Sequence, residues 1–189
     1  MTTTLQRNLD EHIELFVRLG TLTACISEAS SLIINALVGG HKLMICGNGG
    51  SAADSQHIAA EMTGRFVKDR KPLAAMALST DTSALTCIAN DYSFDDVFAR
   101  QLLGLGRQGD CLLAISTSGN SKNVIRAVEA ARSLSIRTVG LLGKDGGLLQ
   151  SMCDVSIVVP SETTARIQEA HILIGHTLCG MVEESLGLA

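Results

Sequence analysis

The sequence has no tryptophan, and aromatic residues make up only 3% of its 189 residues. Aliphatic side chains must therefore supply most of the apolar burial, within a total hydrophobic content of 46%. This length and composition suffice for a single domain, residues 1–189, with a substantial core. The scarcity of aromatic residues favours helices packed on a sheet.

The chain also lacks any block of lysine or arginine, and its formal net charge is -4. This balance argues against a dedicated nucleic-acid surface or an electrostatic membrane anchor. The N-terminus has neither a basic region nor a continuous apolar region of the kind that a signal peptide carries. No run approaches the ~18 uninterrupted apolar residues typical of a membrane span. We therefore expect a cytoplasmic protein that binds neither nucleic acid nor membrane.

The cysteines form no CxxC pair, and most of them stand singly within apolar runs. This pattern predicts buried, reduced thiols. The six are Cys25, Cys46, Cys87, Cys111, Cys153 and Cys179.

Short apolar runs alternate with segments of helical periodicity along the chain, which indicates an α/β fold with a parallel sheet covered by helices on both faces. Strands are expected near residues 42–46, 73–78, 111–116, 138–142 and 155–159. Helices are expected at 51–63, 82–89, 95–103, 121–134 and 164–186, after two helices within 4–38 that end at Gly39-Gly40.

Two loops between a predicted strand and a predicted helix are suited to an anion. In the first, Asn48-Gly49-Gly50, glycines let backbone N–H groups approach a ligand, and Ser51 is the expected N-cap of the next helix. The second is a hydroxyl-rich segment formed by Ser116, Thr117, Ser118 and Ser121. Either alone could be a tight or capping turn, but together at strand ends they favour phosphate binding. Neither matches a Walker or GxGxxG motif, so nucleotide chemistry is not favoured.

Four further side chains form a candidate metal or acid–base set. His57 and Glu61 lie one turn apart on one helix, a spacing that can grip a metal ion or form a surface hydrogen-bonded pair. Gln168 and His176 share a broad face of the last helix. His176 lies in an apolar run, where it could equally be a satisfied core histidine.

Four separated motifs resemble the phosphoheptose isomerases of the sugar isomerase (SIS) domain family. They are GNGGSAADSQH, STDTSALTCIANDY, STSGNS and TARIQEAHILIGH, and the resemblance spans about residues 5–185. It implies a single SIS domain, a five-stranded parallel sheet flanked by helices in a three-layer sandwich. It also implies a homotetramer, in which helices within 4–38 pack and active sites lie between subunits.

The resemblance implies a reaction as well, from D-sedoheptulose 7-phosphate to D-glycero-D-manno-heptose 7-phosphate, the first step toward ADP- and GDP-heptose precursors of bacterial surface glycans such as lipopolysaccharide. By matched positions, one Zn²⁺ per subunit is held by His57, Glu61, Gln168 and His176. Substrate is contacted by Asn48, Gly49, Gly50, Glu61, Asn90, Asp91 and Gln168, and its phosphate by Ser116, Thr117, Ser118 and Ser121.

These residue types suit an aldose–ketose isomerisation through a cis-enediolate, which needs a base, an acid near the oxygens and stabilisation of developing charge. We assign the base at carbon to Glu61 and the acid–base partner to His176, with the metal as Lewis acid. His171 is given a structural role, and Arg65 and Arg166 are expected to be ordinary solvated arginines.

Two other functions are compatible with a SIS domain. A sister branch includes a non-catalytic protein that binds the bacterial replication initiator, and it departs from the isomerase pattern at the positions of Glu61 and His176. Other SIS domains sense a sugar phosphate without transforming it. The presence of Glu61 and His176 beside His57 and Gln168 favours the enzyme.

Overall fold

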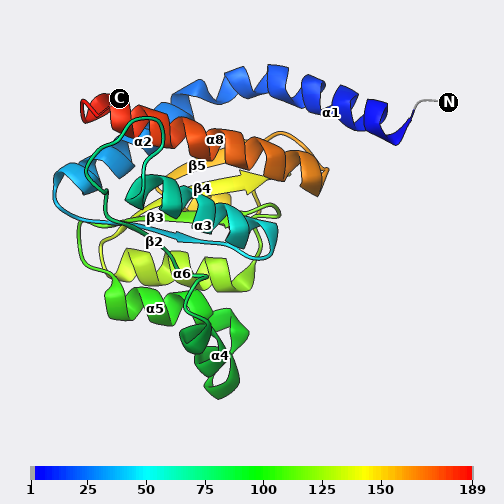
Figure 1. Cartoon of the computed structure of the whole chain (residues 1–189). Coiled ribbons are helices and arrows are strands. Elements are labelled where there is room, and N and C mark those ends of the chain that lie inside the picture. The colour runs from blue at the N-terminus through cyan, green and yellow to red at the C-terminus, as the bar shows by residue number, and fades with distance from the viewer. Residues whose placement is uncertain (1–2, 189) are drawn as a thin grey trace.

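Five short strands pair into one parallel sheet in the order β2-β1-β3-β4-β5 in the computed structural model, which describes residues 3–188 (Figure 1). The strands are β1 (Leu43–Cys46), β2 (Ala75–Ala77), β3 (Cys111–Ser116), β4 (Arg137–Gly143) and β5 (Val155–Val159). In register, Ile45 of β1 aligns with Ala77 of β2 and with Leu113 of β3. The predicted five-stranded parallel sheet is thus confirmed.

Eight α-helices and two 3-10 turns accompany the sheet within the described residues. They are α1 (Thr4–Arg18), η1 (Leu19–Leu22), α2 (Thr23–Val38), α3 (Gly50–Thr63), α4 (Thr82–Asp91), η2 (Phe94–Asp96), α5 (Val97–Leu105), α6 (Lys122–Ser133), α7 (Leu149–Met152) and α8 (Thr164–Ser185). Each predicted helix is present to within about two residues. The single-turn α7 was missed, because four residues are too few to show helical periodicity.

The two faces of the sheet bury separate apolar clusters. Alternate strand residues such as Ile45 and Leu113 face α2, α3 and α8, whereas Met44 and Leu112 face α5 and α6. Figure 1 shows α2 and α8 above the strands and α5 and α6 below them. Side chains alternate along a strand, so a fully buried parallel strand needs apolar residues at every position, and this explains its continuous apolar run.

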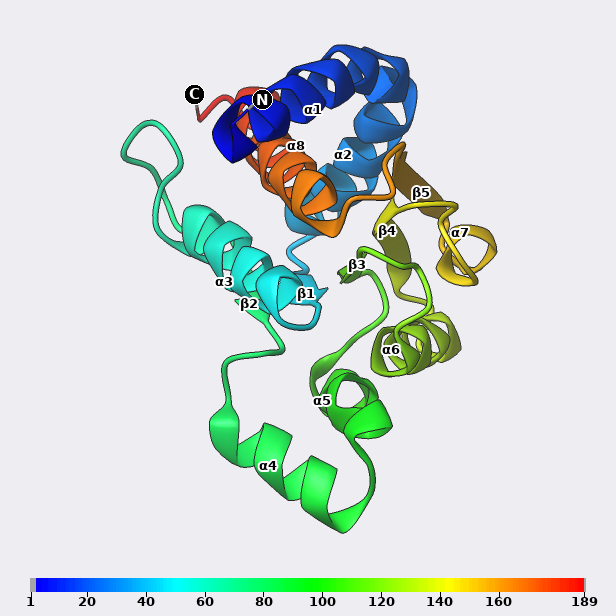
Figure 2. The ribbon, with the colours of Figure 1, turned by 90° about the vertical axis from the view of Figure 1, so that its right-hand side faces the viewer.

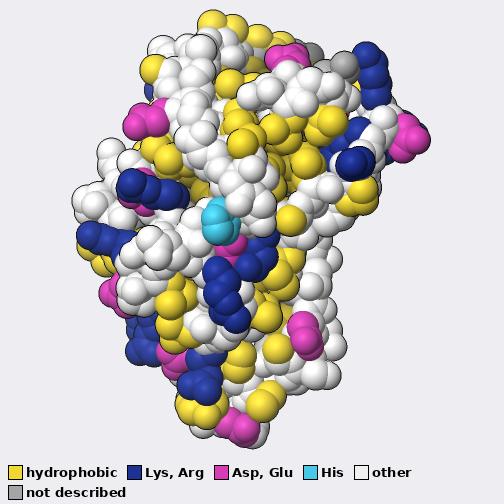
Figure 3. Space-filling model, turned by 90° about the vertical axis from the view of Figure 1, so that its left-hand side faces the viewer, with side chains coloured by type: hydrophobic (Ala, Val, Ile, Leu, Met, Phe, Trp, Pro, Cys, Tyr) yellow, Lys and Arg dark blue, Asp and Glu magenta, His cyan; other side chains and the backbone are white. Residues whose placement is uncertain are grey.

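The N-terminal helical stretch is much less buried than the rest of the molecule. Residues Thr4–Val38 are long and apolar enough to cross a membrane by length and composition alone, and only 22% of their most apolar 18-residue window is buried. On α1, Leu5, Leu9, Ile13 and Val17 are exposed at every fourth residue. Figure 3 shows several groups of hydrophobic side chains, with other atoms between them, on the upper half of another face. Large exposed apolar areas are typical of surfaces that take part in interactions.

The thiols are all free, as predicted, but not all are buried. Cys46, Cys111 and Cys179 are buried, Cys25 and Cys153 are half-buried, and Cys87 is exposed. The prediction of burial was wrong for Cys87 because α4, which carries it, has no buried residue.

Candidate metal and substrate site

The two candidate anion-binding loops lie at the carboxyl edge of adjacent strands. They are the glycine loop, residues 47–50, and the hydroxyl loop, residues 116–121. Cys46, the last residue of β1, aligns with Ala114 of β3, so the loops that follow these two strands emerge side by side. The chain places β2 and β3 on opposite sides of β1, which makes this a topological switch point where open α/β sheets bind ligands. Figure 2 looks onto this edge, where α3, α6 and α8 begin.

A reciprocal pair of amide hydrogen bonds ties the two loops together. The side chain of Asn48 donates to Asn123 and accepts from it, both at 2.8 Å. Asn123 is buried at the start of α6, which makes this contact costly to break. Sequence reasoning missed Asn123, because spacing along the chain cannot reveal a partner in a distant loop.

The backbone of each loop depends on glycine. Gly49 has φ 55°, and α3 begins at Gly50, so Ser51 lies inside the helix and its predicted role as N-cap was wrong. Gly119 has φ 65°, and a Cβ there would lie 1.9 Å from the carbonyl oxygen of Gly146. The turn within the hydroxyl loop therefore requires glycine, for its conformation and for its space.

Two of the four hydroxyls of this loop lie together. The Oγ atoms of Ser116 and Ser121 are 3.0 Å apart, and Thr117 and Ser118 are half-buried between them. Ser121 stands at the N-cap position of α6, but its side chain forms no cap hydrogen bond. Its hydroxyl and the helix N-terminus are thus both available to an anion.

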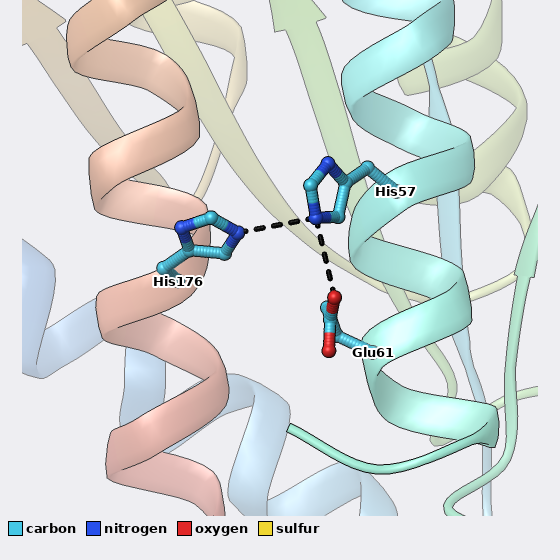
Figure 4. A group of neighbouring side chains, drawn as sticks. All are labelled: His57, Glu61 and His176. Atoms are coloured by element: carbon cyan, nitrogen blue, oxygen red, sulfur yellow. Dashed lines mark hydrogen bonds and ion pairs between the residues drawn. The ribbon is translucent and has the colours of Figure 1, made fainter. Parts of the chain in front are cut away.

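His57, Glu61 and His176 form one compact group between α3 and α8 (Figure 4). The Nε2 atom of His57 lies 3.2 Å from Nε2 of His176 and 3.2 Å from Oε1 of Glu61. The His57 side chain is 48% exposed and that of Glu61 24%, so the group is open to a ligand. Sequence spacing joined only His57 to Glu61, and the packing of α3 against α8 adds His176.

This geometry suits a zinc ion. Ligand atoms bound at about 2.0–2.1 Å in a tetrahedron lie about 3.3 Å from one another. Two separations in this group are 3.2 Å, and its three ligand atoms all lie within 4.8 Å of one another. Two imidazoles and a carboxylate are a donor set that zinc accepts at catalytic sites, where a fourth position stays open. The three residues could therefore hold one divalent cation without a large movement.

Gln168 lies next to Gly50 at the start of α3. A Cβ built on Gly50 would come within 2.2 Å of the Gln168 side-chain nitrogen, so the amide occupies the space that the glycine leaves. Residues 50 and 57 are about 10 Å apart along the helix axis. The amide thus lies toward the glycine loop, and its role as fourth metal ligand stays a prediction.

Asp54 is a polar group of the same region that sequence reasoning missed. It lies on α3 between Gly50 and His57, and its Oδ2 atom is buried without a hydrogen-bond partner. Burial raises the pKa of this carboxyl, and the nearby His57 partly offsets the rise. Asp54 precedes His57 by three residues, which places both on one face of a helix, and this spacing could have identified it from the sequence.

Asn90 and Asp91 are not brought to this group within one chain. They are exposed at the end of α4, which packs on α5 and η2 and lies apart from α3 and α8 in Figure 2. The Asn90 amide donates to Asp91 at 2.7 Å, and this bond holds the pKa of the Asp91 carboxyl below its usual value. Any role for them at the site needs a second chain.

Of the three other residues considered from the sequence, one is exposed and two are buried with structural contacts. Arg65 is exposed as expected, but Arg166 is only 8% exposed and donates to Glu169 and to the carbonyl oxygen of Asn8 on α1. The prediction of a solvated Arg166 was wrong because α1 covers it. His171 is fully buried, its Nε2 lies 3.0 Å from the carbonyl oxygen of Leu142, and burial lowers its pKa to about 4.

Comparison with known proteins gives one consistent result. The SIS domain family matches residues 9–143. The phosphoheptose isomerase of Nitratiruptor sp. is 56% identical over 96% of this chain and 97% of its own length. That of Rhodospirillum rubrum is 53% identical over 90% of this chain and 91% of its own. The solved structure of the phosphoheptose isomerase from Neisseria gonorrhoeae superposes with a TM-score of 0.91 at 47% identity, covering 95% of this chain and 97% of that one.

Proposed function

The chain belongs to the phosphoheptose isomerases of the SIS domain family, and from this premise we propose that it converts D-sedoheptulose 7-phosphate to D-glycero-D-manno-heptose 7-phosphate with the help of zinc. That it is an isomerase acting on a sugar phosphate follows from the family. The observation that carries the finer proposal is the group of His57, Glu61 and His176, with neighbouring ligand atoms at 3.2 Å.

Glu61 serves as the base that removes a proton from the carbon beside the substrate carbonyl. His176 exchanges a proton with the neighbouring oxygen, so that a cis-enediolate forms, and the proton is then returned to the adjacent carbon. The carboxylate and the imidazole approach the same space from α3 and α8, which supports a division of labour between them. A bound zinc ion would supply Lewis-acid stabilisation of the negative charge that develops on the substrate oxygens.

The phosphate is held by Ser116, Thr117, Ser118 and Ser121, and Asn48, Gly49, Gly50 and Gln168 contact the sugar between phosphate and metal. The axial offset of about 10 Å from Gly50 to His57 supports a long substrate, since a short phosphosugar would not reach from one end to the other. Asn90 and Asp91 contribute from a neighbouring subunit, because they lie apart from the group in their own chain.

Self-association follows from the same proposal. The exposed apolar side chains of α1 support packing against other copies of the chain, and we propose a homotetramer with one Zn²⁺ per subunit. Gln168 is proposed as the fourth ligand, which requires its amide to turn from Gly50 toward His57. The enzyme acts in the cytoplasm at the first step of heptose-precursor synthesis for a bacterial surface glycan.

A non-catalytic role, in initiator binding or sugar-phosphate sensing, has less support. A binding module does not need a carboxylate and two imidazoles whose ligand atoms all lie within 4.8 Å of one another. The spacing of the group therefore favours catalysis over binding alone.

The test is to incubate metal-analysed protein with sedoheptulose 7-phosphate in deuterated buffer, with and without a chelator and with zinc restored, and to follow the products by NMR. We expect zinc-dependent formation of the aldose with deuterium on the carbon next to the aldehyde. If folded, zinc-loaded protein gives no aldose and no exchange, the catalytic proposal is wrong and the sensing or protein-binding function replaces it.

A further inference from the structure

Arg70 and Glu183 form a buried ion pair close to the metal-binding group. The Nε atom of Arg70 donates to Oε1 of Glu183 at 2.7 Å, and the two side chains are only 2% and 1% exposed. The carboxylate also accepts the backbone N–H groups of Phe66 and Val67 at 3.1 and 3.4 Å. Burial alone would raise the pKa of Glu183, but Arg70 and these N–H groups hold it below its usual value. The pair is thus charged, and the proposed chemistry does not use it.

The guanidinium group also closes the end of α3. Its Nη1 donates to the carbonyl oxygen of Met62 at 2.6 Å, and its Nη2 donates to that of Glu61 at 2.8 Å. The last carbonyl groups of a helix have no partner within the helix, and α3 ends at Thr63. Arg70 therefore fixes the turn that carries Glu61 through hydrogen bonds to its backbone.

The segment between α3 and Arg70 reaches the third member of the group as well. The Phe66 ring packs on the His176 ring with centroids 5.5 Å apart, and it lies 3.6 Å from the space that a side chain at Gly180 would fill. Figure 1 shows the segment rising from the end of α3 to the C-terminal part of α8. Phe66 is in turn anchored through its N–H by Glu183.

We propose that Arg70 and Glu183 are positioning residues that hold Glu61 and His176 at the spacing needed to bind the metal. The inference rests on the proposed metal site, but its contacts involve only this chain's own residues. Glu183 belongs to α8 and Arg70 caps α3, so their ion pair joins the two helices that supply the three ligands. Without it, the last turn of α3 would fray and Glu61 would lose its fixed distance from His57.

Two variants test this role. Arg70→Met combined with Glu183→Met removes both charges together, so neither is left buried without a partner. Arg70→Lys keeps a positive charge but loses the planar fork that reaches Glu61 and Met62. The matched control is Lys42→Met with Asp110→Met, because Asp110 also pairs with a cation (2.6 Å) and accepts two backbone N–H groups, but at the amino edge of the sheet.

The measurements are the dissociation constant of zinc, by competition with a chromophoric chelator, and the imidazole NMR signals of the metal-free protein labelled with ¹⁵N-histidine. Residues that orient metal ligands typically contribute 10–100-fold to affinity, so we expect both Arg70 variants to bind zinc at least about tenfold more weakly. The control should stay within about twofold. The signals of His57 and His176 should shift in the Arg70 variants and stay unchanged in the control.

Folded Arg70 variants that bind zinc as tightly as the parent protein would overturn the inference. If the double variant does not fold, Arg70→Lys decides the question alone. If the parent protein itself binds no zinc, the metal part of the proposed function is wrong. The imidazole signals then still decide between a positioning role, in which they shift, and a purely structural one, in which they do not.

Discussion

At the scale of single residues, Glu61 is the group whose replacement most directly tests the proposed chemistry. Glu61→Gln keeps the size and one oxygen ligand but removes the base, so kcat should fall by about 10²–10⁴-fold. The check is steady-state turnover at matched zinc occupancy, with Glu184→Gln, an exposed residue of α8, as the control. Turnover within a few per cent of the parent's value would remove Glu61 from the mechanism.

His171 supplies a prediction about stability and pH. Burial lowers its pKa from 6.5 to about 4, so the folded state binds the proton less readily than the unfolded state does. The contribution of the buried, neutral His171 to the free energy of unfolding is present in full above pH 6.5 and is lost as the pH falls toward 4. The loss from this single residue reaches about 3 kcal/mol of unfolding free energy.

The measurement is urea unfolding at a series of pH values at one protein concentration. His171→Gln keeps a donor for the carbonyl oxygen of Leu142 but cannot titrate, so its stability should fall less steeply between pH 6.5 and 4. Parallel curves for the two proteins would show that His171 does not bind a proton on unfolding in this range.

The candidate residues show what a sequence can and cannot reveal at this scale. His57 and Glu61 are one helical turn apart, so their proximity follows from spacing alone. Asn123 and Asp54 were missed because their importance depends on a partner in another loop and on a buried oxygen. Arg166 was misassigned because only the packing of α1 buries it.

At the scale of elements, α3 links the glycine loop, through Gly50, to the group of His57, Glu61 and His176. Gly50→Ala would bring a Cβ within 2.2 Å of the Gln168 side-chain nitrogen, and this flexible amide would have to move. The fold should tolerate the change, with stability altered by less than about 1 kcal/mol. We expect kcat/KM to fall about tenfold or more, because small displacements of positioning groups are costly in catalysis.

Thermal unfolding and steady-state kinetics measure the two effects separately. Gly104→Ala in α5 is the control, since open space surrounds it and its kinetics should not change. If Gly50→Ala keeps full kcat/KM, the present position of Gln168 has no role in the reaction.

The elements themselves were predictable where apolar runs are clearly delimited along the chain. The strands β3 and β5 have the expected bounds because apolar runs ended by polar or turn residues define them on both sides. The 3-10 turn η1 and the short α7 were not predicted, since tertiary packing and not local periodicity holds such short turns. The order of the strands was not predicted, because no pattern within a strand specifies its neighbours in the sheet.

At the scale of the whole molecule, the exposed apolar face of α1 has no counterpart among residues 3–188, which the structure describes. Leu5, Leu9, Ile13 and Val17 are 68%, 44%, 60% and 78% exposed, although they recur at helical spacing as core residues do. The sequence marks them as apolar but cannot distinguish a core from an interface, because both need the same periodicity. Their exposure in the single chain is what points to other copies.

Replacing two of them tests this interface and the site together. Ile13→Glu with Val17→Glu places two charges where apolar contacts would form, and the assembly should dissociate to smaller species in sedimentation velocity. Because α4, which ends with Asn90 and Asp91, lies apart from α3 in one chain, turnover should fall as the proposed tetramer dissociates, while zinc affinity changes little. Arg7→Glu, on another side of α1, is the control and should remain assembled. A dissociated variant with full turnover would mean that each chain holds a complete site, and that α4 acts elsewhere.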